Sequence, residues 1–244
     1  MNIFITGGTT GIGLALAQLY LAEGHRVAVC GRDLSKLPPT FQGEKFQVDV
    51  TSRQEVLDAV RLFSQNGLDL MIASAGISLG EKARLPEFKI MQEILAVNVM
   101  GVVYAFEAAM EIMRRQGSGH LVAMGSVAGL VGLPGAAGYS GSKACVLKIC
   151  ESLAIDLRDL GIFVTAIAPG FIDTPLTRKN NHPMPFLMSV ETAARKIKKA
   201  IAARRSIYIF PLRMRVLMTI LAWLPRNIYL ALMILLRRYQ DRLI

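Results

Sequence analysis

Short runs of apolar, often β-branched residues alternate with longer amphipathic segments along most of the chain. Runs that are apolar at consecutive positions are typical of parallel strands, which are covered on both faces. The segments between them are long enough for helices that connect parallel strands through right-handed crossovers. The pattern therefore predicts an α/β fold with a doubly wound parallel sheet. The expected strands are 2–6, 26–30, 45–49, 68–74, 120–124 and 162–167.

The length of 244 residues suits a single α/β domain, since one core of this kind reaches about 250 residues before a chain divides. The composition changes near residue 195. Residues 1–194 hold 16 Lys and Arg against 17 Asp and Glu, whereas 195–244 hold 12 basic residues and one acidic residue. We therefore expect one domain over 1–200 and a basic, apolar helical extension over 201–244.

The extension contains two apolar runs, 216–224 and 228–236, separated by Pro225 and flanked by arginines. Neither run has the roughly 20 residues that a membrane-spanning helix requires. Because proline breaks or starts a helix, we expect two short helices in a hairpin. Such basic, apolar helices suit a membrane interface. Two alternatives are packing over the protein's own substrate cleft and formation of an oligomer interface.

A glycine-rich loop joins the first expected strand to a helix-like segment. Gly7, Gly11 and Gly13 occupy the turn, where glycine permits a tight bend and lets the backbone approach a phosphate closely. The following helix would direct free N–H groups and its positive end at a pyrophosphate. In this strand-loop-helix context the loop indicates a dinucleotide site of the Rossmann type.

The residue at the tip of the second strand distinguishes the two nicotinamide cofactors. A carboxylate there would accept the ribose hydroxyls and repel a 2′-phosphate, but this chain has a small residue followed by Arg32. An arginine pairs well with a phosphate dianion, so NADP(H) is favoured over NAD(H). Arg32 could instead be a solvated loop charge, and Asp33 could turn inward.

Ser126, Tyr139 and Lys143 form a candidate catalytic set. Ser126 follows the strand 120–124, and Tyr139 opens a helix on which Lys143 lies four residues later, on the same face. A carbonyl that accepts hydride needs a proton, and a nearby cation favours the phenolate form of a tyrosine. Singly, each residue also has a purely structural explanation.

Together with the glycine loop, these residues resemble the short-chain dehydrogenase/reductase family over about residues 2–190. Thr6-Gly7 to Gly13 matches its glycine motif, Asp49-Val50 its adenine contact, Asn98 its active-site asparagine, and Pro169 to Pro175 its nicotinamide-binding stretch. One departure is Ala73-Ser74-Ala75-Gly76, where the family has Asn-Asn-Ala-Gly.

The resemblance implies an NAD(P)-dependent oxidoreductase. Tyr139 would be the acid or base, Ser126 would bond the substrate oxygen, Lys143 would also hold the nicotinamide ribose, and Asn98 would support a proton relay. The implied cofactor-binding residues, besides Arg32, Tyr139 and Lys143, are Gly7, Thr9, Thr10, Gly11, Ile12, Gly13, Asp49, Val50, Ala75, Gly76, Pro169, Gly170, Ile172 and Thr174. It also implies a homodimer or homotetramer formed through helices over 87–115 and 139–160.

The resemblance places a substrate lid at about 176–190, where residues 184–188 are apolar. Apolar, flexible side chains suit a hydrophobic, even lipid-derived, carbonyl or alcohol substrate, although they could simply pack the lid against the body of the protein.

We expect no metal site and no nucleic-acid partner. Without a secretory signal pattern, we expect a cytoplasmic protein, peripheral on the cytoplasmic membrane face if the extension binds lipid. An alternative function is a non-catalytic nucleotide sensor or membrane scaffold.

Overall fold

The computed structural model describes residues 1–78, 87–179 and 183–240. Residues 180–182 of the expected lid and the last four residues of the extension lie outside this part of the chain.

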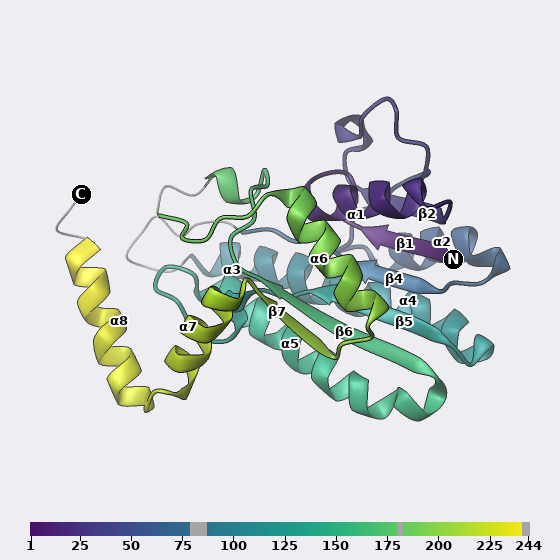
Figure 1. Ribbon diagram of the computed structural model, residues 1–244. Helices are drawn as coiled ribbons and strands as arrows, with labels where there is room; N and C mark the ends of the chain where they lie inside the picture. The colour runs from purple at the N-terminus through teal and green to yellow at the C-terminus, as the bar shows by residue number, and fades with distance from the viewer. Residues whose placement is uncertain (79–86, 180–182, 241–244) are drawn as a thin grey trace.

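The centre of the molecule is a seven-stranded parallel sheet with strand order β3-β2-β1-β4-β5-β6-β7 (Figure 1). All six expected strands are present, which confirms the predicted doubly wound α/β fold. The strand order reverses between β1 and β4, so their loops diverge there and leave a crevice at the carboxyl ends of the strands. The strands are β1 (Asn2–Thr6), β2 (Arg26–Gly31), β3 (Glu44–Gln47), β4 (Leu70–Ala73), β5 (Gly119–Met124), β6 (Ile162–Pro169) and β7 (Ile207–Phe210).

The seventh strand was not predicted, and it lies in the segment that the sequence analysis assigned to the extension. β7 pairs with β6, with Phe210 beside Pro169, and the Phe210 side chain is buried. Its four residues follow a basic turn and precede Pro211, so the run is too short to stand out by its pattern. The sheet therefore continues to residue 210, and only the helices beyond it extend from the body.

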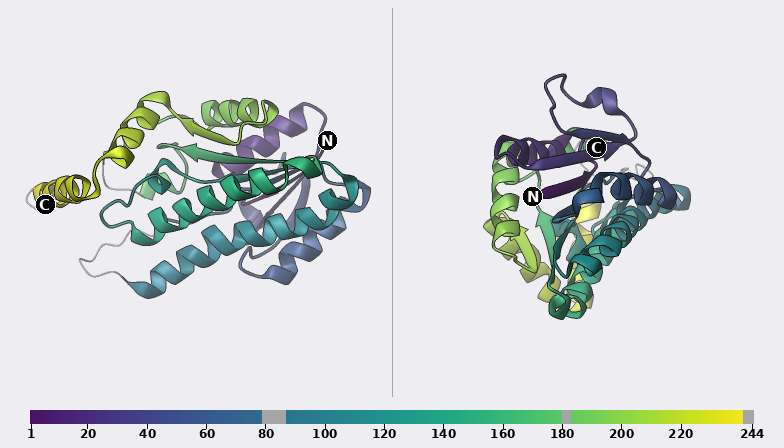
Figure 2. Two further views of the ribbon diagram at one scale, coloured as in Figure 1. Left: turned by 90° about the horizontal axis from the view of Figure 1, so that it is seen from below. Right: turned by 90° about the vertical axis from the view of Figure 1, so that its right-hand side faces the viewer.

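Helices cover both faces of the sheet in three layers (Figure 2). α1 (Gly11–Ala22) and α6 (Val190–Ala202) lie on one face, and α2 (Arg53–Phe63), α4 (Gly101–Gln116) and α5 (Ala137–Asp156) lie on the other. α3 (Phe88–Leu95) runs into α4 through a π-helical turn, η3 (Ala96–Met100).

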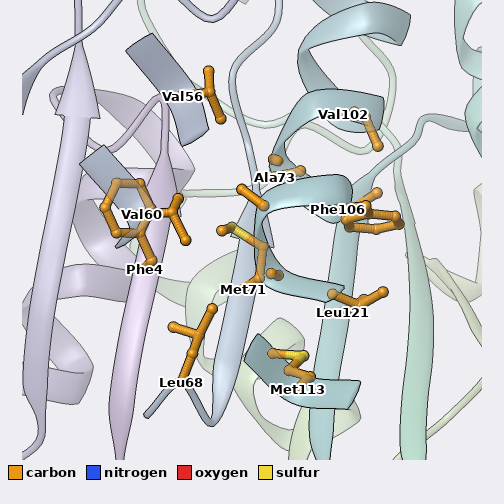
Figure 3. Packing of buried hydrophobic residues seen from close by; sticks show 14 of the residues in the cluster. Phe4, Val56, Val60, Leu68, Met71, Ala73, Val102, Phe106, Met113 and Leu121 are labelled. Carbon is orange, nitrogen blue, oxygen red and sulfur yellow. The ribbon is translucent and has the colours of Figure 1, made fainter. Parts of the chain in front are cut away.

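Alternating side chains of the strands supply the two cores. Ile3 and Ile5 point to the layer of α1 and α6, whereas Phe4 belongs to the core on the side of α2 and α4, where it lies beside Val60 of α2 (Figure 3). The helical stretch Phe88–Gln116 is long and apolar enough to cross a membrane by composition alone, since an 18-residue window within it has a mean hydropathy of 1.5. Its α4 part packs on the sheet through buried residues such as Phe106, so it is a core helix.

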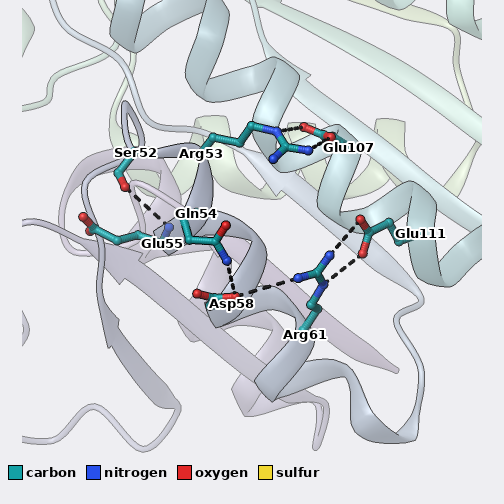
Figure 4. Close-up of polar contacts among 8 residues, drawn as sticks. All are labelled: Ser52, Arg53, Gln54, Glu55, Asp58, Arg61, Glu107 and Glu111. Atoms are coloured by element: carbon teal, nitrogen blue, oxygen red, sulfur yellow. Dashed lines mark hydrogen bonds and ion pairs between the residues drawn. The ribbon is translucent and has the colours of Figure 1, made fainter.

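Two arginine–glutamate pairs join the outer surfaces of α2 and α4 (Figure 4). Arg61 donates two hydrogen bonds to Glu111, both of 3.0 Å, and Arg53 pairs with Glu107 in the same way. These side chains are largely exposed, so each pair contributes at most about 1 kcal/mol. The pairs align the two helices, while the apolar core supplies most of the stability.

Beyond β7 the chain forms α7 (Leu212–Trp223) and α8 (Arg226–Gln240). The two helices expected on either side of Pro225 are therefore present. The chain direction turns by 119° between them, so they form an open bend instead of a close hairpin. Figure 1 shows α8 projecting from the body at the end of the molecule.

Candidate active site

A cleft of about 420 Å³ lies at the carboxyl ends of the strands, next to the switch point between β1 and β4. Its volume is in the range of small-molecule sites. Ser126 lines it, as does every residue expected to bind the cofactor: Gly7, Thr9, Thr10, Gly11, Ile12, Gly13, Arg32, Asp49, Val50, Ala75, Gly76, Tyr139, Lys143, Pro169, Gly170, Ile172 and Thr174.

The loop between β1 and α1 has the geometry of a pyrophosphate cradle. Gly7 has a φ of +64°, and a Cβ there would lie 2.5 Å from the Cα of Ala75. A Cβ on Gly13 would lie 2.4 Å from the Gly7 carbonyl oxygen, so neither position accepts a side chain without a backbone shift. The Thr10 side chain makes no capping hydrogen bond to α1, and no acidic residue occupies the first turn. This helix end therefore fits an anionic phosphate.

The end of β2 carries two basic side chains at the cleft. Arg32 and Lys36 both line it, four residues apart, and Lys36 was missed by the sequence analysis. Asp33 does not act as a free ribose acceptor, because one carboxylate oxygen accepts hydrogen bonds from Ser35 and the other pairs with Lys36 at 3.3 Å. These bonds lower the pKa of Asp33. Lys36 could have been predicted from the sequence, because it is a second basic residue four positions after Arg32, just beyond the strand.

Asp49, which follows β3, also lines the cleft. Burial raises the pKa of its carboxyl group, but hydrogen bonds from the backbone and hydroxyl of Thr51, with the charge of Arg32, outweigh burial and lower the pKa overall. Asp49 is therefore an ionised acceptor beside Val50 at the expected adenine position.

Tyr139 and Lys143 lie one turn apart in the first part of α5. The Lys143 ammonium is 5.8 Å from the centre of the Tyr139 ring, and Nζ donates a 2.8 Å hydrogen bond to the carbonyl of Met124. Burial lowers the pKa of Lys143 to about 8. Burial also raises the pKa of Tyr139, and a hydrogen bond with the Ser126 side chain offsets this only partly.

This electrostatic state differs from the expectation that Lys143 lowers the pKa of Tyr139. Burial of the phenol sets the direction of the pKa shift, and the Lys143 ammonium donates its hydrogen bond to the Met124 carbonyl. The phenol is therefore held in its protonated form, which is the form that donates a proton to a carbonyl oxygen.

Asn98 does not line the cleft but lies buried behind it, on the π-helical turn η3. Its Oδ1 accepts a 2.8 Å hydrogen bond from the Ile77 backbone, and its Nδ2 donates to the Ile77 carbonyl and to Ser142 Oγ, both at 3.0 Å. A Cβ on Gly76 would lie 3.3 Å from Asn98 Oδ1 and 3.4 Å from Lys143 Nζ. Asn98 thus fastens the loop after β4 to α5. The proton relay remains a prediction.

The segment after β6 folds back over the cleft. Ile172 and Met188 form an isolated β-bridge, and the Asp173 N–H donates a 2.9 Å hydrogen bond to the Met188 carbonyl. These contacts join the two ends of the expected lid. Thr177 Oγ1 accepts a 3.0 Å hydrogen bond from the Thr174 backbone. Three further residues that were not predicted from the sequence also line the cleft, namely Leu176, Thr177 and Lys179.

The sheet, the phosphate cradle and the grouping of Ser126, Tyr139 and Lys143 define a nicotinamide-dependent oxidoreductase. Residues 1–185 match the family model of the short chain dehydrogenases. The chain belongs to this family, and it is an NAD(P)-dependent enzyme, as the sequence analysis predicted. It is 34% identical to an uncharacterized oxidoreductase of Myxococcus xanthus (strain DK1622), over 92% of this chain and 93% of that protein. An uncharacterized oxidoreductase of Staphylococcus aureus (strain MW2) is also 34% identical, over 72% of this chain and 80% of its own.

Solved structures show the same fold. A short chain dehydrogenase from Burkholderia cenocepacia J2315 in complex with NADP superposes with a TM-score of 0.82 at 21% identity, over 94% of this chain and 96% of its own. ElxO with NADP bound gives a TM-score of 0.74 at 26% identity, over 81% of this chain and 90% of its own.

Proposed function

We propose that this enzyme transfers hydride between NADP(H) and the carbonyl or alcohol group of a hydrophobic substrate. The observation that carries the proposal is the meeting of Ser126, Tyr139 and Lys143 in the cleft that holds the phosphate cradle. A pure nucleotide sensor needs the cradle but has no use for a protonated phenol beside a serine hydroxyl in the same cleft.

The bound nicotinamide supplies the hydride for reduction or receives it in oxidation. Ser126 and Tyr139 are placed to hydrogen-bond the substrate oxygen, and Tyr139 donates its proton as that oxygen gains charge. In the reverse direction Tyr139 accepts the proton from the alcohol. Lys143, with a pKa of about 8, is positioned one turn away to favour the phenolate that results.

The preference for NADP(H) rests on Arg32 and Lys36. Two cations beside the ribose end of the cleft would pair with a 2′-phosphate, and the carboxylate of Asp33 is already engaged by Ser35 and Lys36. ElxO, with NADP bound, is consistent with this choice.

Substituting Arg32→Ala together with Lys36→Ala is expected to weaken NADPH binding by roughly a hundredfold, since two charge-assisted contacts are lost, and to leave NADH binding little changed. Equal effects on both cofactors, measured by fluorescence titration, would overturn the preference.

The hydrophobic character of the substrate rests on the apolar residues around the cleft entrance. Leu176 lines the cleft, and Phe186 and Leu187 remain about half exposed on the lid. Such a surface favours aliphatic or ring-bearing compounds over polyanions.

The test is NADPH oxidation with a panel of medium-chain ketones, 3-oxoacyl thioesters, steroids and retinoids. With any substrate so found, Tyr139→Phe should lower kcat by about 10³-fold or more while NADPH binding persists, because only the proton donor is lost. Tyr104→Phe, on α4 away from the cleft, is the matched control. Retained turnover in Tyr139→Phe would refute the mechanism, and NADPH binding without turnover of any compound would favour a sensor.

We also propose that copies of this chain associate through α4 and α5, which lie side by side on one face of the molecule (Figure 2). Ile155 on α5 is 74% exposed, as expected of a contact residue. Light scattering after size exclusion should give a dimer or tetramer for the wild type and a smaller species for Ile155→Asp. A monomeric wild type would rule the assembly out.

A further inference from the structure

The helices α7 and α8 carry an unusual concentration of exposed apolar side chains. Among the described residues, ten of the twenty large hydrophobic residues that are exposed fall between 212 and 236, and Trp223 is 86% exposed. Soluble surfaces seldom keep so large a contiguous apolar patch without a partner. The ten are Leu212, Val216, Leu217, Ile220, Trp223, Ile228, Leu230, Ile234, Leu235 and Leu236.

Both faces of α7 are apolar. Met214 and Met218 face the body and are buried, whereas Leu212, Val216, Ile220 and Trp223 recur at helical spacing on the opposite face and are exposed. A helix that is apolar all round belongs in a core or in lipid. The apolar side chains on the outer face of α7 are therefore exposed to water, with neither protein core nor lipid covering them in this structure.

The helix pair is fixed to the body beside the active-site cleft. Met214, Met218 and Tyr229 pack against Val127 and Val131 of the loop that follows Ser126. The Tyr229 hydroxyl donates a hydrogen bond to the carbonyl of Gly132 on the same loop.

The other side of the pair reaches the lid. The Arg213 guanidinium lies 5.8 Å from the centre of the Phe186 ring. Pro211 and Met214 lie against Gly170 of the nicotinamide stretch. The exposed apolar faces are therefore presented next to the entrance of the cleft.

Charge selects the partner for these faces. Arg213, Arg215, Arg226, Arg237 and Arg238 surround the apolar residues, and 212–240 contains no Asp or Glu. Anionic lipid headgroups would complement this charge, and acyl chains would cover the apolar side chains. A second copy offers the apolar contact but brings the same positive charge to the interface.

Length and shape favour lying in a membrane surface over crossing it. Helices of 12 and 15 residues are about 18 Å and 22 Å long, short of the roughly 30 Å hydrocarbon core. The 119° turn at Pro225 also prevents the two from forming one straight span.

We propose that α7 and α8 form a docking surface for an anionic membrane, with Trp223 and its apolar neighbours inserted into the interface. Docking would place the cleft entrance at the lipid surface, so that a membrane-dissolved substrate reaches Tyr139 without crossing water. This consequence rests on the proposed function, whereas docking itself does not.

The chain contains a single tryptophan, so Trp223 reports docking directly. Full-length protein is mixed with vesicles of phosphatidylcholine containing about one third phosphatidylglycerol, or with phosphatidylcholine alone. With the anionic vesicles, Trp223 emission should shift to shorter wavelength and the protein should float with the lipid. Neutral vesicles should bind at least about tenfold more weakly.

Two variants keep the reporter and test the surface. Val216→Ser with Ile220→Ser, and Arg237→Gln with Arg238→Gln, should each weaken partitioning by about tenfold or more. The matched control is Leu62→Ser, which removes an apolar residue of similar exposure on α2, outside the proposed interface between copies, and should bind as the wild type. All variants should retain NADPH binding, which shows that they are folded.

Three outcomes would overturn the proposal: no blue shift or flotation with anionic vesicles, equal binding to neutral vesicles, or a Trp223 emission that is already blue-shifted without lipid and depends on protein concentration. The last result would assign the surface to self-association. A change in vesicle binding with unaltered turnover of a soluble substrate would separate docking from the proposed reaction.

Discussion

At the scale of single residues, Gly129 sets how closely the loop after Ser126 approaches α5. A Cβ there would lie 2.7 Å from the carbonyl carbon of Lys143 and 2.9 Å from the backbone nitrogen of Ala144. These are backbone atoms of α5 and have no rotamer that relieves the contact. Gly129→Ala should therefore destabilise the protein by about 2 kcal/mol and, by displacing Lys143, lower kcat roughly ten- to hundredfold.

The control for this prediction is Gly132→Ala in the same loop, where an added Cβ meets nothing within 4 Å. Urea unfolding and NADPH turnover should separate the two variants. If both behave alike, close packing against Lys143 is not what requires a glycine.

His120 on β5 makes the fold sensitive to acid. Its Nε2 lies 2.8 Å from Thr165 Oγ1, and burial, aided by the charge of Arg204, lowers the pKa of His120 from 6.5 to about 4. Because the folded pKa is the lower one, the unfolded state binds the proton first, and stability falls as pH decreases from 6.5 towards 4. The loss should reach about 2 kcal/mol near pH 5. His120→Gln, measured by urea unfolding across this range, should lack this part of the pH dependence. Parallel curves for both proteins would contradict the prediction.

At the scale of elements, Tyr229 is the link between α8 and the substrate-side loop. Tyr229→Phe removes the hydroxyl that donates a hydrogen bond to the Gly132 carbonyl, while the ring still fills its site. The free energy of unfolding should therefore fall by about 1 kcal/mol. Tyr229→Ala leaves a cavity among Met214, Met218 and Val131 and should cost about 3 kcal/mol or more.

Hydrogen exchange can show which part of the protein the Tyr229 substitutions destabilise. Amides of α8 and of the loop over 127–133 should exchange faster in both Tyr229 variants, and more so in Tyr229→Ala, whereas amides of β1 should be unchanged. Uniform acceleration over the whole chain would show that Tyr229 supports the global fold instead of this one junction.

The six strands could be predicted because their periodicity is strong and local. β7 could not be, since four residues beside a basic turn are held in place by pairing with β6, which is a tertiary contact. The members of the cleft followed from motif spacing, but Lys36 and the hydrogen-bond partners of Asn98 depend on how separate loops meet. The direction of the pKa shift of Tyr139 could not be predicted from the sequence either, because it depends on the burial of the phenol and on its hydrogen bond with Ser126.

At the scale of the whole molecule, the body and the projecting helices meet just after Phe210. β7 covers the edge of β6, the Gly170 N–H donates to the Phe210 carbonyl at 2.7 Å, and the Phe210 ring is packed in the core formed with α1 and α6. Removing β7 would leave the backbone edge over Ala166–Pro169 unpaired and open this core. Removing only α7 and α8 would expose a smaller apolar cluster around Val127 and Val131.

Two shortened chains therefore test where the catalytic body ends. A chain ending at Pro211 should unfold cooperatively in urea and bind NADPH, but it should no longer float with anionic vesicles. A chain ending at Ser206 should lose at least about 3 kcal/mol more, because the buried Phe210 ring and a strand of the sheet are gone, and it should aggregate or fail to bind NADPH. If both chains were equally stable, β7 would be dispensable to the fold. If the chain ending at Pro211 still bound anionic vesicles as tightly as the full chain, the docking surface would have to lie elsewhere on the molecule.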